Sequence, residues 1–413
     1  MPEATGPTVD AGRVIADLRE LQRRTGNAEG AQRLCWGSEW RQAREFLTEL
    51  LGEIDLEPER DEAGNLWASL EGDAAPAVAV GSHLDSVPDG GWLDGALGVM
   101  AGLGVLRAWA DAGETPARSL TLVDWADEEG ARFGRSLFGS SAFAGTLEPD
   151  RVRGLTDPDG RTLPRALADN DVELDRALDC GARRNGLGAY LELHIEQGPV
   201  MEAEGTAVAA VAGCAGVERH RFRFEGQASH AGTTPMDQRR DAGLAAADTA
   251  LRIEGIAERN HGVATTGALV LHPGIATAVA GQAELLVDLR NSNPASLEGM
   301  LAEALSSGEI EAAKRGCDVA TELVWRIHPI PFDEQLVALA QEAASEAGGR
   351  AEPLTSGALH DAAEVARVLP AAMVFVPSVG GISHAKEEDT PEADLAVGIG
   401  AFGDLVNRVL GQT

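Results

Sequence analysis

The sequence contains no apolar stretch long enough to cross a membrane and only four cysteines among its 413 residues. The cysteines are scattered without a CxxC spacing, so we expect them to be reduced and structural. The first residues lack the basic start and the apolar core of a signal peptide. These absences predict a cytoplasmic protein without a disulfide framework.

Positive charge is scarce as well. Lys314 and Lys386 are the only lysines, so nearly all basic residues are arginines. The 34 lysines and arginines face 66 acidic residues, which gives a formal net charge of −32. A surface this acidic repels phosphate backbones and anionic lipids, which argues against nucleic-acid and membrane partners. The expected partner is a small molecule, and an anionic substrate would need local positive charge in its binding site.

The length of 413 residues exceeds that of one ordinary domain, and a hydrophobic content of 44% is enough for sizeable cores. As far as Ala212, strand-like apolar runs alternate with helical stretches such as Ser38–Gly52 and Gly95–Ala112. This alternation is typical of a layered α/β domain. We predict that residues 1–212 and 326–413 form a three-layer α/β catalytic domain with a mixed sheet.

The pattern changes between residues 213 and 325. Strands are expected at Val217–Glu225 and Ala283–Arg290, and helices at Asp237–Arg259 and Pro294–Arg315. This compact mixture predicts an inserted α+β lid domain with an antiparallel sheet. From Ile327 onward the chain returns to helix, strand and helix, which we assign to the catalytic domain.

The segment Gly81–Gly95, GSHLDSVPDGGWLDG, follows an apolar run and carries His83, Asp85 and Asp94. Its proline and glycines allow the loop to fold back, so that the imidazole of His83 and the carboxylate of Asp94 can converge on one ion. Asp85 stands two residues after His83, where its carboxylate can orient the imidazole ring. An ordinary strand and turn would give the same pattern, so a metal site depends on further ligands elsewhere.

Three later segments supply such ligands. DWADEEGARF carries the adjacent Glu128 and Glu129, whose side chains point in different directions if the chain is extended there. One carboxylate can then bind metal while the other moves a proton. HIEQGP offers His194 and, three residues later, Gln197, whereas His384 follows a pair of glycines near the C-terminus.

Each of these segments follows an apolar run, and open α/β sheets bind their ligands at the ends of such strands. A single histidine beside a strand is usually structural, and paired glutamates usually face solvent. Of only nine histidines, however, His83, His194, His230 and His384 all lie in glycine-rich, turn-bounded segments. This recurrence favours one shared site.

The order of these motifs, together with SHAGTTPM around His230, resembles the amidase, hydantoinase/carbamoylase family of the aminoacylase-like dinuclear zinc peptidase superfamily. The resemblance runs from about Leu34 to Leu405, nearly the whole chain. It implies two divalent metal ions per chain. One ion would be held by His83, Asp94 and His194, and the other by Asp94, Glu129 and His384.

The donor set agrees with this implication. Three imidazoles with carboxylates and no thiolate suit zinc, manganese, cobalt or nickel better than magnesium or calcium, and zinc is the expected ion. The resemblance also implies that Glu128 is the general base and that His230 stabilises the developing oxyanion. The alternative for His230 is a histidine that closes a turn. In the resembling family the lid forms a homodimer interface, and whether His230 serves its own chain or the partner stays open.

Substrate-binding residues follow less directly. Gln197 distinguishes this branch from ordinary aminoacylases, and its amide can both donate to and accept from a ureido group. Arg290 ends an apolar alternation and can grip a carboxylate with its fork of donors, unless it merely pairs with Asp288. Thr277 stands where the family has a substrate-binding asparagine, which suggests an altered specificity. A second departure is Leu359 at a glycine position.

His360 and Asp361 follow that leucine, and they either support the site or simply begin a helix.

We therefore predict a metal-dependent amidohydrolase that cleaves a linear C–N bond. The expected substrates are N-carbamoyl-L-amino acids, which would yield the amino acid, ammonia and carbon dioxide. The alternatives within this class are an allantoate amidohydrolase or another hydrolase of ureido or N-acyl acids, such as an aminoacylase or a dipeptidase. A non-catalytic binding protein on the same scaffold is disfavoured, because Glu128 and all five candidate ligands are present.

Overall fold

The computed structural model describes residues 6–412 and divides into two compact units. The first unit combines the chain up to Gly213 with the chain from Phe332 onward, and the second is Cys214–Pro331. The sequence placed the end of the inserted domain at residue 325, within strand β14 (Asp318–Ile327). That strand continues because its last residue, Ile327, still pairs with Val217.

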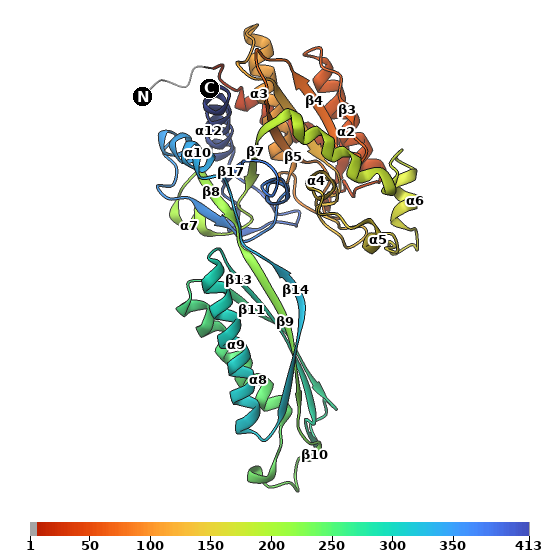
Figure 1. The fold of residues 1–413 in the computed structure, drawn as a ribbon, viewed down its shortest axis with the longest axis vertical. Helices are drawn as coiled ribbons and strands as arrows, with labels where there is room; N and C mark the ends of the chain where they lie inside the picture. Colours follow the sequence, from red (N-terminus) through yellow and green to blue (C-terminus); the bar gives the residue numbers. More distant parts are fainter. Residues whose placement is uncertain (1–5, 413) are drawn as a thin grey trace. The chain divides into compact units, whose positions relative to one another are not determined.

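A mixed sheet forms the centre of the first unit (Figure 1). The strands of this sheet that belong to the first unit run in the order β8-β17-β7-β5-β6-β4-β3, and β16 pairs with β8. The neighbours β17, β7, β5 and β6 are parallel, whereas β8, β4 and β3 are antiparallel to the strands beside them. The bounds are β3 Glu59–Arg60, β4 Leu66–Leu70, β5 Ala77–His83, β6 Leu120–Trp125, β7 Leu187–Ile195, β8 Ala209–Cys214, β16 Leu354–Ser356 and β17 Ala371–Val376.

Helices cover both faces of this sheet. Alternate strand residues such as Val80, Leu122 and Leu193 join one buried apolar cluster with α1, α2, α3, α10 and α12, because successive side chains of a strand point to opposite faces. On the other face, Phe143 of α4 packs against Trp125, with ring centroids 5.2 Å apart. The helices are α1 Ala11–Thr25, α2 Ser38–Gly52, α3 Ala96–Ala112, α4 Phe138–Ala144, α10 Glu334–Glu346, α11 Asp361–Val365 and α12 Glu392–Leu410.

The predicted α/β class with a mixed sheet is confirmed, and α2 has the predicted bounds. Shorter elements complete the unit. They are β1 Gly26–Asn27, β2 Gly30–Ala31, α5 Pro149–Val152, α6 Leu163–Ala168, the 3₁₀ segments η1 Leu174–Gly186 and η3 Val379–Gly381, and α7 Val200–Glu204. No helix among residues 6–412 is long and apolar enough to cross a membrane.

The second unit is an antiparallel sheet in the order β11-β13-β9-β14, and helices α8 and α9 share one apolar core with it (Figure 1). The antiparallel sheet of the inserted domain is thereby confirmed. The bounds are β9 Gly216–Glu225, β10 Ser229–His230, η2 Met236–Gln238, α8 Ala242–Arg259, β11 Val263–His272, β12 Ala278–Val279, β13 Gln282–Asn291, α9 Pro294–Lys314, β14 Asp318–Ile327 and β15 Ile330–Pro331.

The prediction of a helix from Asp237 was wrong at its start. Helix α8 begins at Ala242, because Asp241 is extended and its carboxylate accepts the amide N–H of Leu244 as an N-terminal cap. A short 3₁₀ turn, η2, occupies the preceding residues. The edge strand β11 was not predicted, since its residues are exposed almost throughout and show no alternation of burial.

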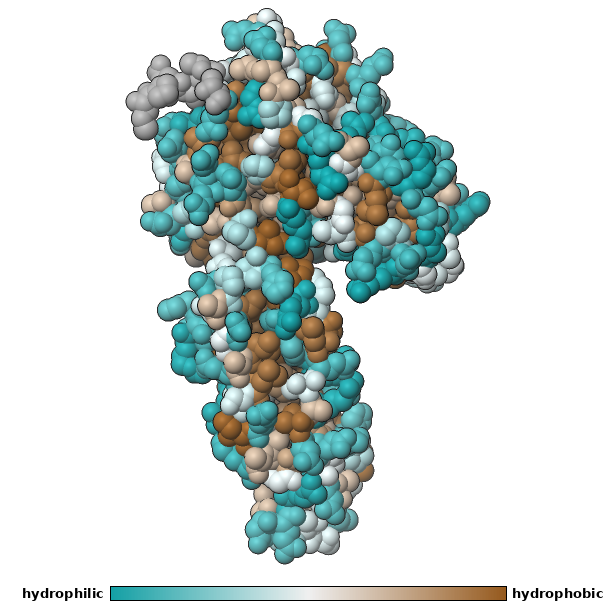
Figure 2. Space-filling model, in the orientation of Figure 1, coloured by the Kyte–Doolittle hydropathy of each residue, from teal (hydrophilic) through white to brown (hydrophobic). Residues whose placement is uncertain are grey.

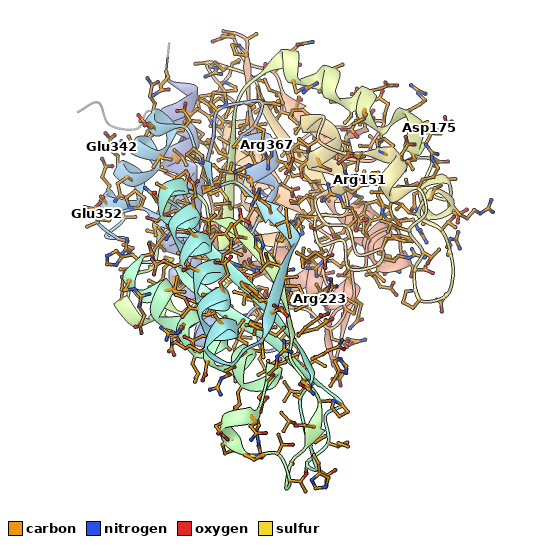
Figure 3. The ribbon with its side chains drawn as sticks, turned by 60° about the horizontal axis from the view of Figure 1, so that its bottom comes forward. Arg151, Asp175, Arg223, Glu342, Glu352 and Arg367 are labelled. Atoms are coloured by element: carbon orange, nitrogen blue, oxygen red, sulfur yellow. The ribbon has the colours of Figure 1, made fainter. Side chains whose placement is uncertain are left out.

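Charged side chains surround both units. Figure 3 labels six of them, and Arg223 lies on β9 in the second unit. Its guanidinium forms ion pairs with Glu284 of β13 and Glu322 of β14, at 3.3 and 2.9 Å. Hydrophobic side chains also reach the surface of this unit (Figure 2). They include Val263 and Val270 of the edge strand β11, which are 65% and 47% exposed.

Candidate metal centre

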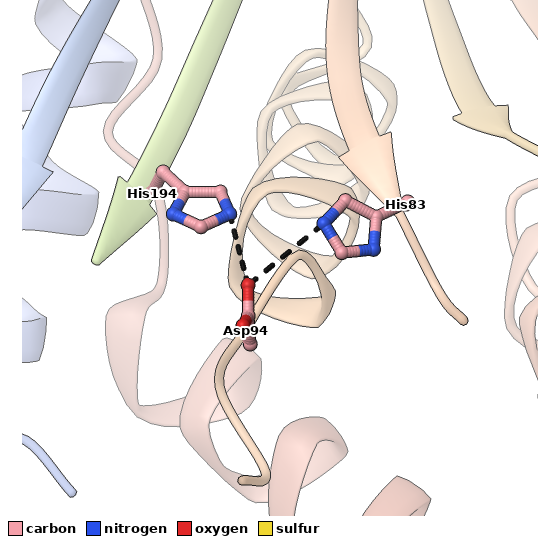
Figure 4. A group of neighbouring side chains, drawn as sticks. All are labelled: His83, Asp94 and His194. Carbon is pink, nitrogen blue, oxygen red and sulfur yellow. Dashed lines mark ion pairs between the residues drawn. The ribbon is translucent and has the colours of Figure 1, made fainter. Parts of the chain in front are cut away.

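His83, Asp94 and His194 come together at one edge of the central sheet. His83 ends β5 and His194 lies one residue before the end of β7, and these neighbouring strands are parallel. Their carboxyl ends therefore meet. Asp94 lies in the loop before α3, with its Oδ1 3.2 Å from Nε2 of His194 and 3.8 Å from Nε2 of His83 (Figure 4). All three side chains are buried.

A second group shares Asp94 with the first. The other carboxylate oxygen, Oδ2, lies 3.1 Å from Nε2 of His384, and that nitrogen is 3.4 Å from Oε2 of Glu129. The ligand atoms of each group lie within 4.8 Å of one another. The structure thus brings all five candidate ligands into two groups, with Asp94 between them.

Backbone contacts fix which ring nitrogens face Asp94. Nδ1 of His83 lies 3.1 Å from the carbonyl oxygen of Asp85, and Nδ1 of His194 lies 2.9 Å from that of Ile195. A carbonyl only accepts, so each Nδ1 carries the proton, and each Nε2 of a neutral ring presents a lone pair. Lone pairs that face a carboxylate repel it unless a proton or a cation lies between them. The rings therefore have the orientation that metal ligands require.

Unpaired buried atoms also fit a cation. Among the described residues, Nε2 of His194 and Oε1 of Glu129 are buried without any hydrogen-bond partner. Buried polar atoms are rarely left unsatisfied, so each such atom calls for an explanation. A divalent cation in each group would satisfy both atoms, and imidazole and carboxylate are donors that zinc and its neighbours accept.

The electrostatics of the site agree with this interpretation. Burial lowers the pKa of His83 to about 3, so the ring is neutral as a ligand must be. Burial opposes a charge on His194 as well, but the Asp94 carboxylate, 3.2 Å from Nε2, outweighs it and raises the pKa to about 9. The same carboxylate, 3.1 Å from Nε2 of His384, raises the pKa of that ring to about 9. A proton on these two rings takes the place that a metal cation would take.

Glu128 lies beside the cluster and belongs to neither group. Its Oε2 is 3.6 Å from Nε2 of His83. Burial, followed by the nearby charge of Asp361, raises the pKa of Glu128 well above its usual range, an effect that neighbouring metal cations would oppose. A buried carboxyl with a raised pKa at the edge of a cationic site suits proton transfer at neutral pH.

Asp85 contacts both the ring of His83 and the two adjacent glutamates. Its carboxylate lies 3.7 Å from Nδ1 of His83, beyond hydrogen-bond distance, whereas its backbone oxygen contacts the ring. The two carboxylate oxygens accept the amide N–H groups of Glu128 and Glu129, each at 3.2 Å. Asp85 therefore fixes the direction in which both glutamates leave the backbone.

Comparison with known proteins identifies the family. The model for peptidase family M20/M25/M40 matches residues 79–408. This chain belongs to that family. An N-carbamoyl-L-amino acid amidohydrolase from Geobacillus stearothermophilus is 36% identical and covers 89% of the chain and 91% of its own length. An allantoate amidohydrolase from Bacillus subtilis is 31% identical over 92% of the chain and 93% of its own length.

The solved structures agree. An amidase of the hydantoinase/carbamoylase family from Burkholderia multivorans has a TM-score of 0.90 and 33% identity, and the match covers 98% of this chain and 99% of that one. The M20 protein is thus a hydrolase of the hydantoinase/carbamoylase branch, as its motifs predicted.

Gln197 of this M20 hydrolase points at the candidate centre. Its amide nitrogen lies 3.0 Å from Oδ2 of Asp94 and 3.2 Å from Oγ of Ser383. Gln197 has a positive φ of 58°, a conformation that non-glycine residues adopt at a cost. The amide that the sequence assigned to a ureido substrate thus already contacts the shared carboxylate.

His230 and Thr277 lie side by side in the second unit. His230 of β10 pairs with Ala278 of β12, and the amide of Ala231 donates to the carbonyl of Thr277 at 2.9 Å. The amide of Gly232 donates to Nδ1 of His230 at 3.1 Å. A neutral ring then carries its proton on Nε2, which is the donor that an oxyanion requires.

Arg290 lies on β13 of the four-stranded sheet, whereas β10 and β12 form a separate two-stranded pair. Its Nε is 2.8 Å from Oδ1 of Asp288, the ion pair that the sequence held as the alternative. His230 and Thr277 adjoin the first residues of β13, whereas Arg290 is next to its last residue. Eight residues of extended chain correspond to roughly 27 Å. Within the unit, the structure therefore does not bring Arg290 to His230.

His360, which the sequence left open between a supporting residue and a helix start, is the N-cap residue of α11 and packs its ring against His194 at a centroid distance of 4.4 Å. Two other residues beside the candidate ligands were not predicted from the sequence. Glu192 shares a face of β7 with His194 and accepts from Ser82 at 2.6 Å; its alternation with His194 was the available signal. Glu388 contacts the loop of Asp94, but it lies in an acidic run that reads as a solvated surface.

Proposed function

We propose that this M20 hydrolase is a dinuclear metal-dependent amidohydrolase that cleaves N-carbamoyl-L-amino acids to the amino acid, ammonia and carbon dioxide. The observation that carries the proposal is one carboxylate, Asp94, faced by the Nε2 atoms of three imidazoles, with Glu129 completing the second group. His83, Asp94 and His194 would hold one divalent cation, and Asp94, Glu129 and His384 the other. Zinc is the expected ion, with manganese, cobalt or nickel as alternatives.

Two such cations would activate a water molecule and would polarise the substrate carbonyl group, whose carbon the water attacks. Glu128 accepts the proton of this water and later returns it to the departing nitrogen. The backbone amide of Glu128 donates to Asp85. This hydrogen bond fixes the start of the Glu128 side chain during proton transfer. His230 donates from Nε2 to the developing oxyanion. Gln197 meets the ureido group, to which an amide can both donate and accept.

Metal content tests the core of this proposal. After removal of metal by a chelator and reloading with zinc, elemental analysis of the wild-type chain should find about two ions. The His384→Ala variant should hold about one, because it loses a ligand of the second group only. Equal metal content in the two proteins, or full activity of a chain that holds one ion, would contradict the shared site.

Arg290 is proposed to bind the substrate carboxylate, because a protein with a net charge of −32 needs a fixed cation for an anionic substrate. Arg290→Lys keeps the charge and loses the fork, so we expect KM for an acidic substrate to rise by roughly 10–100-fold, the equivalent of about 1.5–3 kcal/mol. Steady-state kinetics measure KM, and thermal unfolding measures stability. The unfolding temperature should hardly change.

Arg219 provides a matched control, because its guanidinium also pairs with Asp288, at 2.7 Å. If Arg290 only balances Asp288, Arg219→Lys and Arg290→Lys should behave alike. An unchanged KM in Arg290→Lys, or equal activity of the parent enzyme on the corresponding amino amide, would refute carboxylate binding.

We further propose that the enzyme is a homodimer through the second unit and that His230 serves the partner's site. The position of His230 near the first residues of β13, with Arg290 next to its last residue, supports this, because it places the two proposed substrate contacts far apart within one chain. The exposed edge strand β11 supports it too, because Leu269, Val270 and Leu271 are each at least 40% exposed on a strand with a free side. A partner strand would cover them.

Allantoate hydrolysis is the second candidate. The Bacillus subtilis relative with that name covers 92% of the chain, and Thr277 replaces the asparagine expected beside the ureido group. A panel of N-carbamoyl-L-amino acids, allantoate and N-acyl amino acids, assayed for ammonia and for free amino acid, separates the candidates. Ammonia released in equal amount with an amino acid supports the first, whereas amino acid without ammonia points to an N-acyl substrate. None of the four cysteines forms a disulfide in the structure, which supports a cytoplasmic site of action.

A further inference from the structure

Glu388 is a buried acid to which the proposed mechanism gives no task. It is 2% exposed and lies four residues after His384. Its Oε1 accepts the amide N–H groups of Leu93 and Asp94 at 3.1 and 3.0 Å, and its Oε2 accepts the hydroxyl of Ser383 at 2.9 Å. The carboxylate thus fastens the loop of Asp94 to the loop of His384, which are far apart in the sequence.

The Asp94 loop leaves room for this carboxylate. A Cβ atom on Gly91 would lie 2.0 Å from Cδ of Glu388, so any other residue at this position would force the Glu388 side chain to move. The glycine therefore leaves space for the carboxylate where it now lies.

The donors and acceptors among Gln197, Ser383 and Glu388 can be assigned. The amide nitrogen of Gln197 donates to Oδ2 of Asp94 and to Oγ of Ser383. Ser383 has a single hydroxyl proton, and its nearer acceptor is Glu388 at 2.9 Å rather than Asp94 at 3.3 Å. Three donors converge on Glu388, so the ionised carboxylate is the form that fits. Glu388 thereby draws the proton of Ser383 away from Asp94.

The affected oxygen belongs to one of the two groups. Oδ2 of Asp94 faces His384, whereas Oδ1 faces His83 and His194. A hydroxyl proton turned toward Oδ2 would compete with a cation bound there. It would not affect a cation bound at Oδ1.

We propose that Glu388 is a positioning residue for the second cation, the one assigned to Asp94, Glu129 and His384. It holds Oδ2 of Asp94 and the His384 loop in the geometry for binding, and it has little effect on the first cation. This inference rests on the proposed dinuclear function. It gives Glu388 a selective effect that a buried acid with a purely structural role would not have.

The selective effect is measurable as metal affinity. Zinc titration of chelator-treated wild-type enzyme by calorimetry should give two binding events, and His384→Ala should remove the event of the second cation. The amide of Glu388→Gln keeps the shape but turns a donor toward Ser383 or the backbone. We expect this variant to weaken the second event by roughly 10–100-fold, as for other residues that orient metal ligands, and to leave the first within about twofold.

Glu387→Gln is the matched control, because Glu387 is the adjacent exposed acid, and neither event should change. If Glu388→Gln does not fold, Ser383→Ala tests the same chain of hydrogen bonds and should weaken the second event alone. Equal weakening of both events, or no weakening, would overturn the inference. A wild-type enzyme with a single event would instead refute the dinuclear function, so the two failures are distinguishable.

Discussion

Glu128→Gln should lower turnover by roughly 10²–10⁴-fold while both metal ions stay bound, which is the range for loss of a general base. Glutamine keeps the size of the side chain and the backbone contact with Asp85, but it cannot accept a proton. Glu128 belongs to neither ligand group, so metal content should not change. Single-turnover rates and elemental analysis on the same preparation measure both quantities.

Glu129→Gln is the matched control, because the two glutamates are adjacent and both are held by Asp85. That variant should lose the second ion, since Oε2 of Glu129 contacts His384. The reverse outcome, with metal lost from Glu128→Gln and retained in Glu129→Gln, would exchange the two roles. The comparison matters because each carboxylate lies within 3.6 Å of an imidazole.

The grouping of the candidate metal ligands could be predicted because these residues lie at strand ends. His83 and His194 lie at or next to the ends of parallel neighbouring strands, and an apolar run followed by glycine or proline marks such an end in the sequence. Glu128 and Glu129 follow the third parallel strand in the same way. Topology then brings together residues that are more than a hundred positions apart.

Hydrogen-bond direction could not be predicted in the same way. From the spacing alone, either the carboxylate or the backbone carbonyl oxygen of Asp85 could contact the ring of His83. In the folded loop the backbone carbonyl oxygen makes the hydrogen bond. Glu388 is hidden for a related reason. Its neighbours Glu387 and Asp389 are exposed, so the acidic run resembles a solvated face even though one of its members is buried.

The edge strand β11 of the second unit also could not be predicted from the sequence. Strand β13 alternates buried and half-buried residues and was found, whereas β11 is exposed almost throughout. A strand with apolar residues but no buried face lacks the period of two on which prediction depends. If a partner strand covers β11, its pattern is explained by assembly rather than by the single chain.

His230→Ala should lower turnover by roughly 10²–10³-fold, which is the range for loss of an oxyanion donor. Nδ1 of His230 already accepts the amide of Gly232, which leaves Nε2 as the donor. His261→Ala, which changes an exposed histidine of the same unit, should leave turnover unaltered. Metal content should stay the same in both variants.

Mixed dimers then show whose site His230 serves. Chains with His230→Ala and chains with Glu128→Gln are co-expressed with different tags, and the mixed dimer is purified on both. If His230 acts in the partner's site, one site of the mixed dimer has an intact Glu128 and an intact His230. Turnover per dimer should then recover to about half that of the wild type, since one of two equivalent sites is restored. If His230 acts in its own chain, no site of the mixed dimer is intact, and turnover would stay as low as in the parent variants.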